Sequence, residues 1–551
     1  MDRCGQIAAG APQVRQAPRI DRDPRFNSEP LVNPPLPLQA TPPAPTDSAA
    51  FRDLPGLLAE HAQRTPQALA LRQDERTLTH AQLGALIDRA AAALQRDGGA
   101  PQQVVAICAT SGIDYLVVFL GALRAGLAVA PLAPSSTAAQ IADMVRDSGA
   151  IRFFADGGVL EALRAGGVAV DQLPPITRLD ADFERWLAPL GAQPAAVAIQ
   201  PEWAFNLIYS SGTTGTPKGI VQAHAMRWAH INRAGLIGYA ADSVTLASTP
   251  LYSNTTLVAV IPTLAMGGCV ILCPKFDVLR YLELAQAHRV THSMLVPVQY
   301  QRLMSHPDFD RYDLSSFVAK LSTSAPFHAA LKADVLARWP GALIEYYGMT
   351  EGGGTCILQA HLHPTKLHTV GQPAEGHDIR LIDEQGQEVA PGEAGEVVGR
   401  SAGMMLGYHN QPAKTAEAEW HDAQGQRYIR TGDVGRFDAD GFLILFDRRK
   451  DMVISGGFNI YPSDLEAVLR QHPDVADAAV IGVPSVDWGE TPVALVVRRA
   501  GANTEPEALR QWVNDQVGKT QRLSALRFID ELPRSAIGKV LKRELRDAWR
   551  D

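Results

Sequence analysis

Short apolar runs alternate with helical patterns along most of this chain. Runs such as VVAICA, IRFFAD and FNLIYSS are separated by segments with helical apolar spacing, such as LRYLELAQAHR and AALKADVLARW. Continuous apolar runs of this length are typical of strands buried on both faces of a sheet. The alternation therefore predicts a layered α/β architecture rather than an all-β one.

Changes in composition and hydrophobic pattern divide the 551 residues into three parts. Residues 1–48 include LVNPPLPLQATPPAPTDS, where repeated prolines favour an extended, disordered chain. Residues 49–449 form a large α/β part that becomes β-rich after Gly371, where polar turn pairs punctuate alternating residues. Residues 450–551 restart an α/β pattern, with helices at PSDLEAVLRQHP and PEALRQWVNDQVG and strands at DAAVIGVP and VALVVRRA. We expect a separate small C-terminal domain there.

Composition argues against several classes of protein. The 51 basic and 59 acidic residues give a net charge of −8 without long like-charge runs, so we expect no nucleic acid or anionic membrane partner. The N-terminus lacks the apolar stretch of a secretory signal. The five cysteines lack the density and pairing of a disulfide framework, which fits a reducing compartment. Together these features predict a cytoplasmic protein. Residues 251–274 carry no charge, but Asn254, Pro262 and Gly267 interrupt them. A buried helix, a turn and a buried strand are expected there, not a membrane span.

The strongest local signal is the segment 209–219, YSSGTTGTPKG, directly after the strand-like FNLI. Hydroxyls, glycines and one lysine in a tight loop suit a polyphosphate, because exposed backbone N–H groups bind anions. A flexible linker would not end in Pro-Lys-Gly between two ordered-looking segments. The loop also lacks the Gly-Lys-Ser/Thr ending of a Walker loop.

Together with three later segments, this loop resembles the signature of the adenylate-forming superfamily, which contains acyl-CoA synthetases, peptide-synthetase adenylation domains and beetle luciferases. The later segments are YYGMTE (346–351), YIRTGD (428–433) and PRSAIGK (533–539), in the family's order. The resemblance runs from about residue 52 to 547 and is greatest to the acyl-CoA synthetase and 4-coumarate-CoA-ligase-like branch. It implies a large N-terminal adenylation domain and a small mobile α+β C-terminal domain.

The resemblance also implies which residues bind ATP. Attack of a carboxylate on the α-phosphorus requires several negative charges to be neutralised and aligned. Glu351, beside Thr350, would bind Mg²⁺, because a hard cation that bridges phosphates needs a carboxylate. The residues that would contact the nucleotide are Ser210, Ser211, Gly212, Thr213, Thr214, Lys218, Ser324, Ala325, Pro326, Tyr347 at adenine, and Asp433 and Arg448 at ribose. Asp447 stands where the family usually has glycine, so the register between Arg448 and Arg449 stays open.

Lys539 is implied to be the lysine that approaches the α-phosphate and the acyl oxygen during adenylation. As one of several basic residues near Arg534 and Lys542, it could instead be only a solvated side chain. Its place on the small domain predicts that two domains close to build the site, with a hinge at residues 450–451. The segment 455–459, with Gly456 and Gly457, would then face the site for thioester formation.

The acid substrate is the least constrained part of the prediction. In relatives the acyl pocket is built around a segment that corresponds to 249–256, where Tyr252 and Ser253 replace the histidine of many members. Further expected pocket residues are Ser322, Gly348 and Gly352. The interval between Arg233 and Lys275 has no arginine or lysine, which argues against a dicarboxylic substrate.

We therefore expect an AMP-forming acid–thiol ligase that uses ATP, Mg²⁺ and coenzyme A on either an aryl or cinnamate-type acid or a medium or long fatty acid. Two alternatives remain open at this point. One is an adenylating enzyme that loads a carrier protein. The other is a non-catalytic nucleotide or acyl sensor, which the presence of Lys218, Glu351, Asp433 and Lys539 disfavours.

Overall fold

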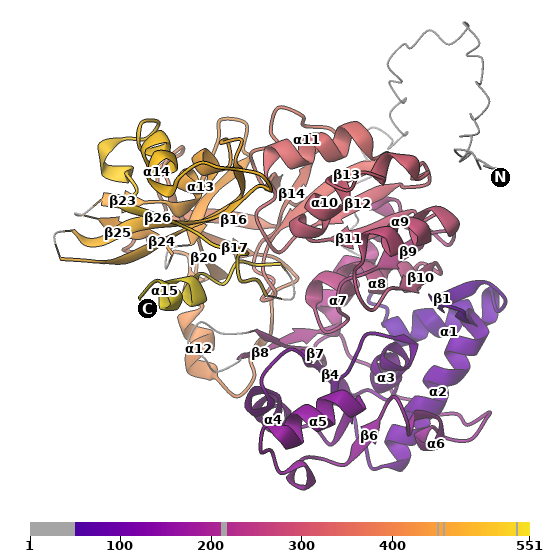
Figure 1. Cartoon of the computed structure of the whole chain (residues 1–551). Helices are drawn as coiled ribbons and strands as arrows, with labels where there is room; N and C mark the ends of the chain where they lie inside the picture. The colour runs from indigo at the N-terminus through magenta and orange to yellow at the C-terminus, as the bar shows by residue number, and fades with distance from the viewer. Residues whose placement is uncertain are drawn as a thin grey trace, which may run out of the picture. The chain divides into compact units, whose positions relative to one another are not determined.

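The computed structural model describes residues 50–210, 218–448, 451–455, 458–486, 488–535 and 538–550 (Figure 1). Within these residues the strands form four sheets, of nine, seven, five and five strands. Two of the sheets are largely parallel and helix-covered, and the other two are largely antiparallel. The predicted fold class is confirmed: layered α/β with a β-rich portion, followed by a small α+β part. The mobility of that last part stays a prediction.

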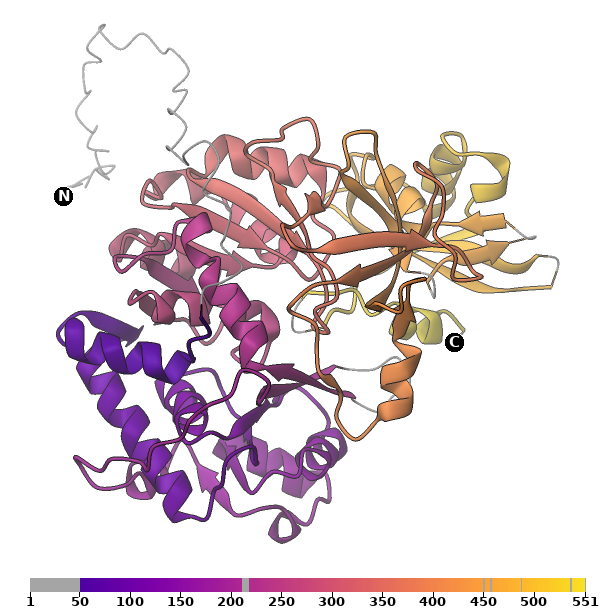
Figure 2. The same cartoon turned by 180° about the vertical axis from the view of Figure 1, so that it is seen from behind.

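The seven-stranded sheet has the order β18-β8-β7-β4-β3-β5-β6. Alternate residues of β3 enter two different cores: Val105 and Ile107 pack with α2 and α3, and Ala106 and Cys108 pack with α4 and α5. Helices therefore cover both faces (Figure 2). The elements are β3 (Val104–Cys108), β4 (Ala128–Pro131), β5 (Arg152–Ala155), β6 (Ile176–Arg178), β7 (Ala204–Ser210), β8 (Lys218–Ala223), β18 (Gly407–Tyr408), α3 (Ile113–Arg124), α4 (Ala138–Asp147), α5 (Gly157–Ala165) and α6 (Phe183–Trp186).

The nine-stranded sheet has the order β15-β14-β13-β12-β11-β9-β10-β1-β2. Its strands are β1 (Leu69–Gln73), β2 (Arg76–Thr79), β9 (Val244–Ala247), β10 (Cys269–Leu272), β11 (His292–Leu295), β12 (Ala319–Ser322), β13 (Ala342–Tyr347), β14 (Cys356–Gln359) and β15 (Gln372–Pro373). The helices that pack on this sheet or lie near it are α1 (Leu54–Arg64), α2 (His80–Arg96), α7 (His224–Asn232), α8 (Asn254–Ala265), α9 (Val278–Ala287), α10 (Pro297–Met304) and α11 (Ala329–Arg338).

The uncharged stretch 251–274 folds as predicted, into the buried helix α8, a turn and the buried strand β10. Ser253 begins the helix, because its hydroxyl accepts a hydrogen bond from the backbone N–H of Thr255 (3.3 Å). Gly267 adopts a left-handed φ of +84° after the helix, a conformation that glycine adopts without strain. No helix in the described ranges is both long and apolar enough to cross a bilayer.

The predicted β-rich portion after Gly371 is confirmed as an antiparallel sheet of order β16-β17-β20-β19, with β21 paired to β20. Its elements are β16 (Asp378–Ile382), β17 (Gly395–Arg400), β19 (Glu419–His421), β20 (Arg427–Phe437), β21 (Leu443–Arg448) and α12 (Pro412–Glu417). The core of this sheet is small, with Val397 and Leu443 fully buried in it.

The last part of the chain contains the two helices and two strands expected from its sequence. It has its own core, which includes Val453, Leu465 and Val480. The elements are β22 (Val453–Ser455), β23 (Phe458–Ile460), β24 (Val475–Ser485), β25 (Gly489–Arg498), β26 (Ala525–Phe528), α13 (Pro462–Leu469), α14 (Pro506–Asn514) and α15 (Lys542–Arg550).

Candidate active site

The strand pair β7 and β8 holds the two ends of the predicted phosphate loop together. The strands are antiparallel, and Ser210 lies directly opposite Lys218 in their register. The hydroxyl of Tyr209, just before the loop, donates to Oδ2 of Asp147 (2.6 Å). Ser211, Gly212, Thr213 and Thr214 lie outside the described residues.

Lys218 and Glu351, which are far apart in sequence, meet at one tyrosine. Nζ of Lys218 lies 4.8 Å from the ring centroid of Tyr408, and the Tyr408 hydroxyl donates to Oε1 of Glu351 (2.8 Å). Burial and the Glu351 carboxylate raise the pKa of Tyr408, so its hydroxyl stays a donor at neutral pH. The ring of Tyr408 thus contacts a cation, and its hydroxyl contacts a carboxylate.

Glu351 fits the role of a magnesium ligand. Oε1 is engaged by Tyr408, and Oε2 has no hydrogen-bond partner among the described residues. Those residues contain no group of three or more His, Cys, Asp or Glu side chains placed to hold a metal ion. Mg²⁺ does not need such a group, because it is commonly held by one or two carboxylates together with substrate phosphates and waters.

Tyr347 and Asp433, both expected at the nucleotide, are hydrogen-bonded to each other. The Tyr347 hydroxyl donates to Oδ2 of Asp433 (2.9 Å) and lies 3.3 Å from Oγ1 of Thr431. Burial and Asp433 raise the pKa of Tyr347 well above its usual range, which keeps the phenol protonated. Arg448 lies opposite Asp433 in the β20–β21 register, which places its backbone beside the same pair.

The expected acyl residues come from the ends of β12 and β13 and from the start of α8. Oγ1 of Thr255 and Oγ of Ser324 are 2.7 Å apart, which joins the first turn of α8 to the loop after β12. Ser324 has a left-handed φ of +81°, a strained conformation for a residue with a side chain. Ser322 is fully buried, and Ala325 and the exposed Pro326 continue the loop.

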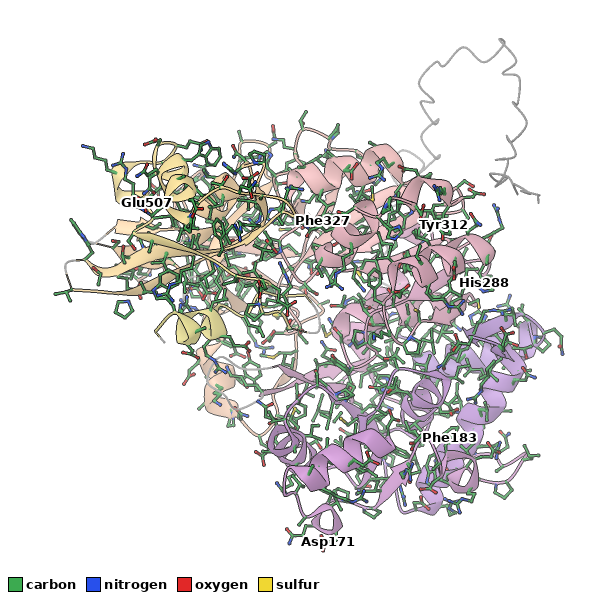
Figure 3. The ribbon with its side chains drawn as sticks, viewed as in Figure 1. Asp171, Phe183, His288, Tyr312, Phe327 and Glu507 are labelled. Atoms are coloured by element: carbon green, nitrogen blue, oxygen red, sulfur yellow. The ribbon has the colours of Figure 1, made fainter. Side chains whose placement is uncertain are left out.

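Two further features mark the edges of this region. Phe327, labelled in Figure 3, stacks on Tyr300 with ring centroids 5.0 Å apart and anchors the loop after β12. The hydroxyl of Tyr252 interacts with Ser135, in the loop after β4.

Glycine is required at Gly352. Its φ is +82°, and a Cβ there would lie 1.9 Å from the carbonyl oxygen of Gly403. A Cβ at Gly348 would lie 3.3 Å from Oγ1 of Thr355, which is closer than an ordinary van der Waals contact. The absence of side chains lets the 346–353 turn pack closely against both neighbours.

Lys539 lies at the end of a tight turn in the C-terminal part. Its N–H donates to Oγ of Ser535 (3.2 Å), and its carbonyl accepts from the N–H of Ser535 (2.8 Å). A Cβ at Gly538 would lie 3.0 Å from Cγ1 of Val298, so the turn contacts the start of α10. Gly456 and Gly457 lie outside the described residues.

Sequence reasoning missed Tyr408 and Gln222. Nε2 of Gln222 donates to the carbonyl oxygen of Thr350 (2.7 Å) and so supports the turn that carries Glu351. Both residues occupy strand positions without a recognisable motif, and only the pairing of β18 and β7 with β8 brings them to the site. The one usable signal was a glutamine within the apolar run of β8, since a polar side chain there needs a partner.

Comparison with known proteins decides the family. The model of the AMP-binding enzyme family matches residues 58–409, and that of the AMP-binding enzyme C-terminal domain matches residues 464–539. The chain belongs to this family. Within it, the chain is 34% identical to a feruloyl-CoA synthase of Amycolatopsis over 492 residues, which cover 88% of this chain and 96% of the relative.

Two other similar proteins span almost the same length. The fatty acid–[acyl-carrier-protein] ligase ScoC of Streptomyces coeruleorubidus is 31% identical over 507 residues, 89% of this chain and 95% of the relative. ATP-bound MatB of Rhodopseudomonas palustris superposes with a TM-score of 0.81 at 28% identity, covering 91% of this chain and 99% of MatB. The predicted membership of the adenylate-forming superfamily and its CoA-ligase branch is confirmed, and with it the class of AMP-forming acid–thiol ligase.

Proposed function

We propose that this chain is an ATP-dependent carboxylic acid–CoA ligase. It would form an acyl-AMP and then an acyl-CoA thioester, and release pyrophosphate and AMP. The observation that carries the proposal is the convergence of Lys218, Tyr408 and Glu351, because a cation and a carboxylate fixed on one ring suit a metal-bound triphosphate.

In the first half-reaction, a carboxylate oxygen of the acid attacks the α-phosphorus of ATP, a new O–P bond forms, and the bond to the β-phosphate breaks as pyrophosphate leaves. Lys218 and the loop 210–214 would bind the β- and γ-phosphates, with Thr350 beside the reacting centre. Lys539 would neutralise charge at the α-phosphate. Tyr347 and Asp433, joined by their hydrogen bond, would orient adenine and ribose. Bound at Glu351, Mg²⁺ would supply positive charge to the phosphate oxygens.

In the second half-reaction, the thiol sulfur of coenzyme A attacks the acyl carbon, a C–S bond forms, and AMP leaves with the electron pair of the C–O bond. The thiol proton passes to solvent. We propose three parts: an extension at 1–48, an adenylation domain at 49–449 and a C-terminal domain at 450–551. The C-terminal domain would rotate between the two steps. The segment 455–459 would then replace Lys539 beside the acyl-adenylate.

The acid would be aryl or cinnamate-type or a medium- or long-chain fatty acid. Similarity to a feruloyl-CoA synthase supports the aryl group. Similarity to ScoC supports a second candidate, in which a carrier-protein thiol replaces coenzyme A.

The test is release of pyrophosphate and AMP from Mg-ATP across a panel of fatty, cinnamic and benzoic acids, with and without coenzyme A. Turnover that requires both an acid and coenzyme A would support the proposal. Acid-dependent exchange of pyrophosphate into ATP without steady AMP release would favour the carrier-protein acceptor. A complete lack of acid-dependent signal would contradict both.

A further inference from the structure

Helix α7 presents three basic residues at a spacing of three: Arg227, His230 and Arg233 at its C-terminal end. Residues three apart lie on one side of a helix. A fourth basic residue, His377, meets them from the segment before β16, because Nη1 of Arg233 lies 2.9 Å from its Nε2. These four residues are called the donor cluster below.

Arg227 is buried with most of its guanidinium unpaired. Only 1% of the residue is exposed, and Nη2 donates to Oε1 of Gln222. Nε and Nη1 are buried and have no hydrogen-bond partner among the described residues. Burial lowers the pKa of Arg227 to about 9, which still leaves the group charged at neutral pH. A buried cation without a counter-ion is unfavourable, so this site calls for an acceptor.

The hydrogen bonds of His377 are also incompletely matched. Its Nδ1 lies 3.0 Å from the backbone N–H of Thr355, and its Nε2 faces Arg233, so each ring nitrogen meets a donor. A neutral imidazole has only one acceptor nitrogen, whichever tautomer it adopts. One of the two donors is therefore left unmatched.

His230 connects the two halves of the cluster. Its Nδ1 is buried without a hydrogen-bond partner among the described residues. Burial, and then the charges of Arg227, His377 and Arg233, lower the pKa of His230 to about 3, so its ring is neutral at neutral pH. Within the described ranges no aspartate or glutamate forms an ion pair with Arg227 or Arg233.

The donor cluster adjoins the residues expected at the acyl group. Thr355, which donates to His377, lies beside Gly348, at 3.3 Å from the position of a Cβ there. Met226, next to Arg227 in α7, has its Cε 3.0 Å from the position of a Cβ at Gly352. Gln222 joins Arg227 to the carbonyl of Thr350. The cluster thus lies behind the turn that carries Glu351.

We propose that the acid activated by this chain carries a second carboxylate, and that the donor cluster binds it. The inference rests on the proposed ligase function and narrows its substrate class to dicarboxylic acids. The absence of cations between Arg233 and Lys275 does not oppose it, because the charges of the cluster come from Arg227 and Arg233, which precede that interval. Arg227, whose Nε and Nη1 have no hydrogen-bond partner among the described residues, would be the main specificity residue.

The test compares acids that differ only in the second carboxylate. The pairs are octanoate with octanedioate, and 3-phenylpropanoate with its ortho-, meta- and para-carboxy derivatives, and the matching carboxamides are neutral isosteres. We expect kcat/KM for the best diacid to exceed that of its monoacid and carboxamide by at least about tenfold, since a site with unpaired donors rejects ligands that leave them unpaired.

Substitution then links the preference to the cluster. Arg227→Met should lower the ratio of diacid to monoacid kcat/KM by at least about tenfold, and Arg227→Lys should retain part of that ratio. Arg185→Met, at a side chain that is 80% exposed on α6, is the control and should leave the ratio unchanged. Thermal unfolding of each variant separates loss of fold from loss of specificity.

The outcomes separate this inference from the ligase proposal. Turnover of monoacids with no preference for any diacid, or an equal loss for both acids in Arg227→Met, overturns the inference and leaves the ligase function standing. If no acid is turned over, calorimetry with the same pairs decides: tighter binding of a diacid that Arg227→Met abolishes supports the inference, and equal binding overturns it.

Discussion

At the scale of single residues, the candidate site depends on hydroxyl groups that join charged side chains. Tyr408 bonds Glu351 while its ring faces Lys218, and Tyr347 bonds Asp433. A hydrogen bond to a charged group is among the stronger ones in proteins. These tyrosines therefore fix where the two carboxylates point.

Tyr408→Phe tests the first of these contacts. The ring beside Lys218 is kept, but Oε1 of Glu351 loses its donor. We expect the KM for Mg-ATP to rise by about fivefold to tenfold, the equivalent of one hydrogen bond of about 1 kcal/mol. Pyrophosphate release at several Mg²⁺ concentrations measures it. Tyr312→Phe, at the half-buried residue labelled in Figure 3, is the control, and an unchanged KM in Tyr408→Phe would contradict the role.

At the scale of secondary-structure elements, a buried lysine joins β12 to the end of α11. Lys320 is fully buried, and its Nζ donates to the carbonyl oxygens of Trp339 (2.9 Å), Pro340 (2.6 Å) and Gly341 (2.7 Å). These three carbonyls directly follow the last turn of α11, where the helix dipole favours a cation. This contact fixes α11 against the strands whose ends carry Ser322 and Tyr347.

Lys320→Met should lower the free energy of unfolding by about 2–4 kcal/mol, because it leaves three carbonyls without their donor in the core. Urea unfolding measures the change. Lys275→Met, at an exposed lysine, is the matched control and should stay within about 0.5 kcal/mol of the parent protein. If Lys320→Met lowers the free energy of unfolding by less than about 1 kcal/mol, the packing of the aliphatic part of Lys320 stabilises the fold and the hydrogen bonds of its Nζ do not.

At the scale of the whole molecule, several histidines are buried or half-buried in neutral form. Burial lowers the pKa of His224, His292 and His377 from 6.5 to about 4 and that of His230 to about 3. The unfolded chain binds protons at these positions below pH 6.5, while the folded chain does not until near pH 4. Their contribution to stability is therefore complete above pH 6.5 and is lost as the pH falls toward 4.

We expect each such histidine to reduce the free energy of unfolding by about 1.4 kcal/mol per pH unit between pH 6.5 and 4. Urea unfolding at half-unit pH intervals measures the slope. His292→Gln, which keeps a polar side chain beside Tyr239, should make the slope shallower by up to one such increment. The exposed His421→Gln is the control. A slope that His292→Gln leaves unchanged would show that this ring is protonated in the folded protein.

The division of the two half-reactions between alternative domain positions also belongs to this scale. Lys539→Ala should lower acid-dependent pyrophosphate exchange by at least about 100-fold, because it removes a cation from the transition state. Thioester formation from a supplied acyl-adenylate and coenzyme A should fall much less. Lys519→Ala, at an exposed lysine of the same part, is the control. Equal losses in both half-reactions would refute the division of labour.

Local sequence determined much of this protein. The apolar runs predicted β3, β5, β7 and β10, because strand and helix periodicity are properties of neighbouring residues. The four motifs indicated the family, and with it Lys218, Glu351, Asp433 and Lys539, because each motif is a short stretch whose residue types can be recognised without a structure.

Only the tertiary structure decided which of these residues meet. Tyr408 and Glu351 are 57 residues apart and Tyr347 and Asp433 are 86 apart, and their contacts follow from the register of β18 on β8 and from the packing of β20 against β13. The same holds for the burial of Lys320 and of Arg227, since neither the charge nor the spacing of a basic residue reveals whether a neighbouring strand covers it. Register and burial arise from contacts between distant segments, and a local pattern does not encode them.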